Sequence, residues 1–194
     1  MLPSPIRVTL QVVQALEALG VPYVLGGSLA SALYGLQRAT LDADLMADLR
    51  TEHLAPLAER LAADFYIDPL TMAEAVATHS HFNLIHQTTM FKVDIFVAKP
   101  RPFDQSELAR RVALVLVDDP EQSAYVASAE DMILVKLEWY LLGGEVSERQ
   151  WRDVLSMLHD QHERLDRAYL RRWAADLGVS DLLQEAIVAA DTWL

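Results

Sequence analysis

A glycine turn between an apolar run and a helical stretch constrains the fold of this chain most. Gly26-Gly27-Ser28 follows the apolar run Tyr23-Val24-Leu25, and Gly35 marks the end of the helical stretch. The apolar run predicts a buried strand, and Ser28 is a favourable N-cap for a helix over residues 29–34. A tight glycine turn at the start of a helix is typical of backbone that cradles phosphate. We therefore expect an anion site at Gly26, Gly27 and Ser28.

Two aspartates follow this helix in a second predicted strand, over residues 41–47. Strand residues two apart share a face, so the carboxylates of Asp42 and Asp44 can contact one divalent cation. A third acid, Asp94, stands alone in the apolar run 92–96, where burial is costly without a partner. The sequence thus predicts that these three aspartates hold divalent cations, with a two-ion site expected. A buried salt bridge from Asp94 to Lys92 or to an arginine is the alternative.

The remaining patterns divide the chain into a mixed first part and a helical second part. Helices are expected over 8–19 and 51–63, and strands over 82–86, 90–98 and 112–117, of which the first two form a hairpin. Residues 64–80 fit either a loop or a short helix over 72–78. Every segment from Ser128 on is helical in pattern, over 128–142, from 147, and over 166–177 and 180–193. We therefore predict an α/β (α+β) fold: a mixed sheet flanked by helices over 1–125, with a C-terminal helical subdomain over 126–194 packed on it.

Composition excludes several classes of protein. The chain has 194 residues and a formal net charge of -12, which argues against nonspecific nucleic-acid binding, because such binding depends on cationic side chains. With 0 cysteines, disulfides and thiolate metal sites are excluded. No apolar run approaches the roughly 18 residues that span a bilayer, and the first seven residues lack a signal-peptide pattern. A cytoplasmic protein without membrane contact is the expectation.

These motifs together resemble a known family. The glycine turn, the segment Arg38-Ala39-Thr40-Leu41-Asp42-Ala43-Asp44-Leu45 and the later Val93-Asp94-Ile95 resemble the nucleotidyltransferase superfamily, which includes DNA polymerase β. The helical blocks 128–136 and 147–154 resemble those of AbiEii-like abortive-infection toxins and their uncharacterised bacterial relatives. The resemblance covers roughly residues 8–160 and implies a nucleotidyltransferase-type fold.

The resemblance also implies roles for individual residues. Gly27 and Ser28 would contact the triphosphate of a nucleoside triphosphate (NTP), and the three aspartates would hold Mg²⁺. Lys136 would reach the phosphates, and Asp153 would be the acid of the second helical motif and belong to the catalytic set. Arg38 and Thr40 flank the metal acids and would steady either the strand or a phosphate.

Two functions of different classes follow from these observations. The first is Mg-dependent transfer of a nucleoside monophosphate from an NTP to a hydroxyl on a tRNA 3′ end, a protein or a small molecule. The toxin-like resemblance would add an antitoxin or another regulator as partner. The alternative is a catalytically silent copy of the fold that binds a partner, although degenerate copies are expected to lose metal acids and this chain keeps all three. A P-loop or Rossmann nucleotide binder is excluded, because neither glycine motif is present.

Overall fold

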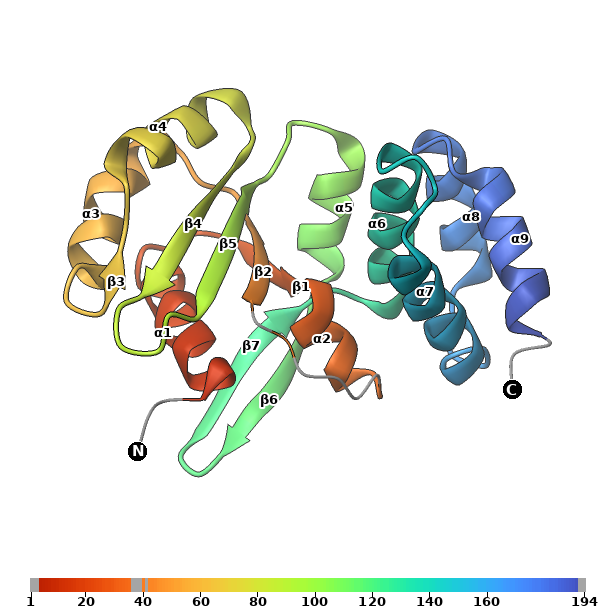
Figure 1. Ribbon diagram of the computed structural model, residues 1–194, viewed down its shortest axis with the longest axis horizontal. Helices are drawn as coiled ribbons and strands as arrows, with labels where there is room; N and C mark the ends of the chain where they lie inside the picture. The colour runs from red at the N-terminus through yellow and green to blue at the C-terminus, as the bar shows by residue number, and fades with distance from the viewer. Residues whose placement is uncertain (1–3, 36–39, 41, 192–194) are drawn as a thin grey trace. The chain divides into compact units, whose positions relative to one another are not determined.

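A computed structural model describes residues 4–35, 40 and 42–191 of the chain. Its described part contains a mixed sheet of seven strands in the order β3-β4-β5-β2-β1-β7-β6 (Figure 1). The strands are β1 (Tyr23–Gly26), β2 (Asp42–Ala47), β3 (Phe65–Tyr66), β4 (His81–His86), β5 (Lys92–Val97), β6 (Val112–Asp118) and β7 (Glu121–Val126). β2 pairs with β5 and β1 with β7 in parallel, whereas the other neighbouring strands are antiparallel. The predicted α/β class with a mixed sheet is confirmed.

Five helices accompany the strands along the first part of the described chain: α1 (Pro5–Ala18), α2 (Gly27–Leu33), α3 (Thr51–Leu61), α4 (Pro69–Thr78) and α5 (Pro102–Arg110). Side-chain caps fix two of their starts, because Ser4 and Asp68 accept hydrogen bonds from the first turns of α1 and α4. α1 contacts α3, α3 contacts α4, and α4 packs on β4, so these helices form one group on the sheet (Figure 1). The ambiguous stretch 64–80 is therefore a short strand and a helix.

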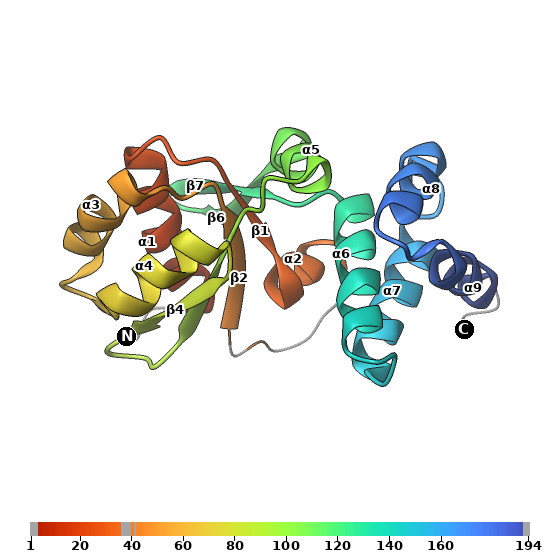
Figure 2. The same cartoon turned by 90° about the horizontal axis from the view of Figure 1, so that it is seen from above.

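The helical second part contains α6 (Ala129–Leu142), α7 (Glu148–Asp160), α8 (Arg167–Asp176) and α9 (Ser180–Ala190), and Figure 2 shows their succession. Ser128, Ser147 and Asp166 cap α6, α7 and α8 through their side chains. The described residues divide into two compact units. The first holds those up to Ala30 and from Thr40 to Ala127, and the second holds Ser31 to Gly35 and those from Ser128 on. No helix among the described residues is long and apolar enough to cross a membrane.

The central strands present one apolar face and one polar face. Ala43 and Leu45 on β2 and Val93 and Ile95 on β5 are all 0% exposed. The alternate β2 residues Asp42 and Asp44 are partly exposed, as the period of two requires. The core therefore fixes the direction in which both aspartates point.

Three elements were not predicted: β3, α5 and β7. No helix was expected between the strands over 90–98 and 112–117, but residues 102–110 form α5, and Pro102 occupies its first turn, where its missing N–H costs nothing. No strand was expected directly after 112–117, but Asp119-Pro120 is the turn of a hairpin that β7 forms with β6. β7 alternates exposed and more buried residues and buries only Ala124 and Val126, so its apolar signal is weak.

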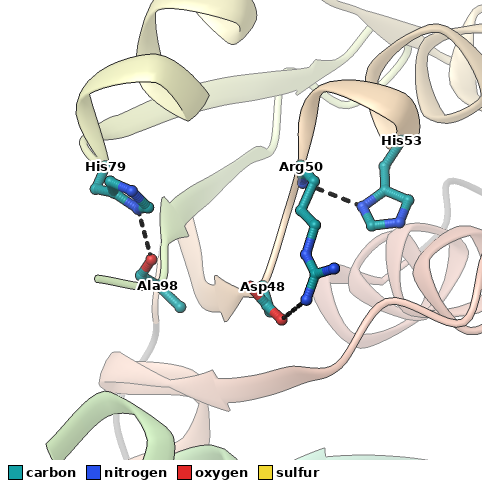
Figure 3. A network of polar contacts seen from close by, with 5 residues as sticks. All are labelled: Asp48, Arg50, His53, His79 and Ala98. Carbon is teal, nitrogen blue, oxygen red and sulfur yellow. Dashed lines mark hydrogen bonds and ion pairs between the residues drawn. The ribbon is translucent and has the colours of Figure 1, made fainter. Parts of the chain in front are cut away.

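Short polar contacts order the loop that leaves β2 (Figure 3). Arg50 bonds to the Asp48 carboxylate at 3.3 Å, and its backbone N–H donates to Nδ1 of His53 at 3.1 Å. His79 ends α4 in the left-handed conformation, and its Nδ1 lies 2.8 Å from the Ala98 carbonyl oxygen. These contacts thus fix the chain just after the C-terminal ends of β2 and β5. Asp42 and Lys92 lie at the N-terminal ends of the same strands.

Candidate functional site

The pairing of β2 with β5 brings two of the predicted metal ligands together. In this parallel register Asp44 lies opposite Asp94, and Asp42 lies opposite Lys92. Paired residues of neighbouring strands project to the same face of a sheet, so all four side chains share one face. Residues from two segments about fifty positions apart therefore form one cluster in the middle of the sheet.

Backbone of the glycine turn borders this cluster from the other side. Gly26 ends β1 and is the antiparallel partner of Asp44. Gly27 has φ +60° and lies against the Asp44 carboxylate, so that a Cβ built on Gly27 would lie 1.8 Å from Oδ2 of Asp44. Only glycine fits here, because the position demands both a left-handed backbone and the absence of a side chain. The glycine turn and the paired acids, predicted separately, are thus in contact.

The helix after the glycine turn begins two residues earlier than predicted. α2 begins at Gly27 and not at Leu29, so Ser28 lies within its first turn, and Ser28 is 7% exposed. The predicted start of this helix is therefore wrong by two residues, and the capping role of Ser28 stays a prediction. The close approach of Gly27 to Asp44 explains the shift, since this left-handed glycine makes the turn and opens the helix.

Asp94 takes the salt bridge that was the alternative to metal binding. Its Oδ2 lies 2.7 Å from Nζ of Lys92, and the two side chains are 10% and 39% exposed. Its other carboxylate oxygen, Oδ1, is buried and has no hydrogen-bond partner among the described residues. A buried carboxylate oxygen without a partner is costly and points to a missing ligand.

The pKa of Lys92 is affected by all three acids. The pKa of its ammonium is raised, first by the hydrogen bond to Asp94, then by the charges of Asp94, Asp42 and Asp44, against the lowering effect of partial burial. Sequence reasoning treated Lys92 only as one possible partner of Asp94. The signal that identifies it is the i, i+2 spacing from Asp94, which places both side chains on one face.

Thr40 steadies the first acid. Its hydroxyl donates to the Asp42 carbonyl oxygen at 2.8 Å and lies 3.1 Å from Oδ1 of the same residue. This agrees with the strand-steadying role expected of Thr40. The predicted contact at Arg38 lies outside the described residues.

The donor set fits a hard divalent cation. Carboxylate oxygens are the ligands that Mg²⁺ prefers, and the buried Oδ1 of Asp94 is an unused donor in the cluster. Within the described ranges no group of three or more His, Cys, Asp or Glu side chains is placed to hold a metal ion as the side chains stand. One of the three carboxylates, that of Asp94, is already paired with the Lys92 ammonium.

Lys136 and Asp153 pair with each other in the second unit. Nζ of Lys136 on α6 lies 2.8 Å from Oδ2 of Asp153 on α7, and each side chain is 11% exposed. The two residues that the resemblance marked in the helical blocks thus form an ion pair between neighbouring helices. The phosphate contact of Lys136 and the catalytic role of Asp153 stay predictions.

The histidines near the end of α4 have structural partners. His79 contacts the Ala98 carbonyl (Figure 3), and the His81 ring stacks on Phe96 with centroids 5.4 Å apart.

Comparisons with known proteins identify the fold. The sequence matches no protein-family model and no curated protein. Among solved structures, an antigenic nucleotidyltransferase-like protein from Paracoccidioides brasiliensis superposes with a TM-score of 0.51 at 17% identity, covering 91% of each chain. The lincomycin-bound lincosamide antibiotic adenylyltransferase LnuA (TM-score 0.45, 16% identity, 75% of this chain and 91% of that one) is also similar. So is a putative nucleotidyltransferase from Thermotoga maritima (TM-score 0.47, 16% identity, 76% and 91%).

The likeness to the Paracoccidioides protein establishes the architecture. This chain has the fold of that nucleotidyltransferase-like protein, so the nucleotidyltransferase-type fold expected from the motifs is confirmed.

Proposed function

We propose that the chain transfers a nucleoside monophosphate from an NTP to a hydroxyl acceptor. One observation carries the proposal: Asp44 lies opposite Asp94 on β5 and against Gly27 of the glycine turn. Two predicted metal acids and the predicted phosphate turn therefore meet within the nucleotidyltransferase fold.

Each part of the cluster has a task in this reaction. A divalent cation, when bound, would neutralise the triphosphate and polarise the reacting oxygens. Asp42, Asp44 and Asp94 would hold it, and the backbone of Gly26, Gly27 and Ser28 would border the phosphates. In the transfer itself the acceptor hydroxyl releases its proton to water and its oxygen bonds to the α-phosphorus. The bond from that phosphorus to the bridging oxygen breaks, and pyrophosphate leaves.

The acceptor is a hydroxyl of a tRNA 3′ end, a protein or a small molecule. The net charge of -12 disfavours an acceptor held by general phosphate attraction, so an RNA acceptor needs a confined basic surface. A toxin role with an antitoxin or regulator partner, as in AbiEii-like proteins, is part of the same proposal. It predicts growth arrest on expression that depends on Asp44.

A labelling experiment tests the activity. The full chain is incubated with each α-labelled NTP, Mg²⁺ and total RNA, protein extract or small hydroxyl compounds, and the labelled product identifies donor and acceptor class together. Asp44→Asn keeps the shape of the side chain but removes its charge, and should lower label transfer at least about a hundredfold.

Asp48→Asn is the matched control for this variant. Asp48 lies just beyond β2 and pairs with Arg50 at the surface, so its loss should cost at most about 1 kcal/mol of stability and leave transfer unchanged. Equal transfer by wild type and Asp44→Asn would remove the catalytic assignment. Absence of label from every acceptor with wild type would favour the catalytically silent partner-binding module.

A further inference from the structure

One lysine lies among the carboxylates that are expected to hold the metal. Lys92 and Asp94 are two residues apart on β5, and their charged groups are 2.7 Å apart. The Asp94 side chain is 10% exposed, so water screens this pair only on the lysine side. The contact is therefore stronger than an ordinary surface salt bridge.

The strand register places the Lys92 ammonium beside all three acids. Lys92 lies opposite Asp42, while Asp94 lies opposite Asp44, so the four charged groups are neighbours on one face. Three carboxylates and one ammonium carry a net charge of about -2. Without the ammonium, three like charges would lie together in a partly buried place, which is unfavourable.

We propose that Lys92 is an internal cation that competes with the divalent metal for Asp94. The inference rests on the proposed function, since the metal is the one that the proposed reaction needs. A divalent ion bound by Asp94 and Asp44 would repel the Lys92 ammonium and must loosen its bond to Oδ2. Lys92 is a positioning residue in this scheme: it holds the acids in place before loading and weakens binding of metal alone.

The same geometry indicates that metal binding depends on the presence of the NTP. A triphosphate brings several negative charges to the cluster, and these give the displaced ammonium a new counter-charge. The metal should therefore bind more weakly alone than together with the NTP. Removal of the lysine charge should abolish most of that difference.

Metal titration of the full chain tests this competition without any measurement of activity. Lys92→Met and Lys92→Gln remove the charge, Lys92→Arg keeps it, and Lys99→Met removes a charge from an exposed lysine after β5. Calorimetry with Mn²⁺ alone gives affinity, and thermal unfolding with and without Mg²⁺ gives stability. Lys92→Met and Lys92→Gln should bind Mn²⁺ about tenfold tighter or more than wild type. Without metal they should have a lower melting temperature, and Mg²⁺ should raise that temperature more than it does for wild type.

Lys92→Arg and Lys99→Met should titrate like wild type. Equal or weaker Mn²⁺ binding by both charge-removing variants would overturn the inference, because a purely structural lysine would lower melting without raising metal affinity. Absence of binding by every variant would overturn it too. Tighter metal binding by the variants combined with no nucleotidyl transfer by wild type would uphold the competition and refute the proposed function, so the two failures are distinguishable.

Discussion

At the scale of single residues, the contact between Gly27 and Asp44 links the two motifs on which the site depends. The carboxylate of Asp44 fills the space that a side chain at residue 27 would occupy. Backbone with φ +60° costs a residue other than glycine about 1 kcal/mol or more. Any substitution at Gly27 must therefore displace the acid as well as strain the turn.

Gly27→Ala should accordingly damage the site more than it damages the fold. The added Cβ would lie 1.8 Å from Oδ2 and 2.6 Å from Cγ of Asp44, so the carboxylate must move and nucleotidyl transfer should fall as far as in Asp44→Asn. Gly20→Ala is the control, because Gly20 has φ +66° but no atom within 4 Å of its built Cβ. Melting temperature and label transfer are measured for both variants; unchanged transfer by Gly27→Ala would refute the role of this contact.

The sequence predicted the site acids but not their electrostatics. Spacing alone places Asp42 and Asp44 on one face, and an acid in an apolar strand marks Asp94. The choice between a metal and Lys92 as the partner of Asp94 depends on side-chain conformation and on the β2–β5 register. That register joins distant segments, so no local pattern contains it.

At the scale of secondary-structure elements, the buried ion pair between α6 and α7 has a structural role of its own. Lys136 and Asp153 are each 11% exposed and 2.8 Å apart, and the two helices pack together. A lysine within an apolar helical run either reaches solvent or meets an anion, and Lys136 meets the Asp153 carboxylate. The partner comes from the next helix, which sequence spacing did not identify.

Lys136→Met should therefore destabilise the protein by roughly 2–4 kcal/mol, because the Asp153 carboxylate loses its ammonium in a buried place. Lys136→Met with Asp153→Leu should cost less than the sum of the single changes, as for coupled residues. Chemical denaturation gives these free energies, with Lys99→Met as a near-neutral control. Nucleotide affinity is measured alongside: its loss without a change in stability would instead support a phosphate contact for Lys136.

Among the strands, β7 was not predicted, and its pairing with β1 is long-range. β7 joins the sheet through a parallel contact of Val126 with Leu25, about a hundred residues away, and only half of its own residues are apolar. By contrast, the starts of the helices from Ser128 on were predicted to within one residue, because side-chain caps and helical periodicity are local signals.

At the scale of the whole molecule, two tyrosines in different units should make the free energy of unfolding fall at alkaline pH. Burial raises the pKa of Tyr34 to about 12, with further contributions from the charges of Glu130 and Asp131. Burial also raises the pKa of Tyr23, which donates a hydrogen bond to Glu17 at 2.8 Å. Both shifts favour the neutral phenol in the folded protein.

The sign of the resulting pH dependence follows from proton binding. Between pH 10 and 12 the unfolded chain has released the Tyr34 proton while the folded chain retains it, so unfolding is favoured as pH rises. Wild type should lose on the order of 2 kcal/mol across this window through Tyr34 alone, and further stability through Tyr23. Tyr34→Phe cannot release this proton, so its free energy of unfolding should fall less steeply from pH 9 to pH 12, as measured by urea denaturation at fixed ionic strength. Tyr66→Phe is the control: it removes a hydroxyl from a residue that is 60% exposed, and its free energy of unfolding should fall with pH as in wild type. The same dependence on pH in wild type and both variants would contradict the burial of Tyr34.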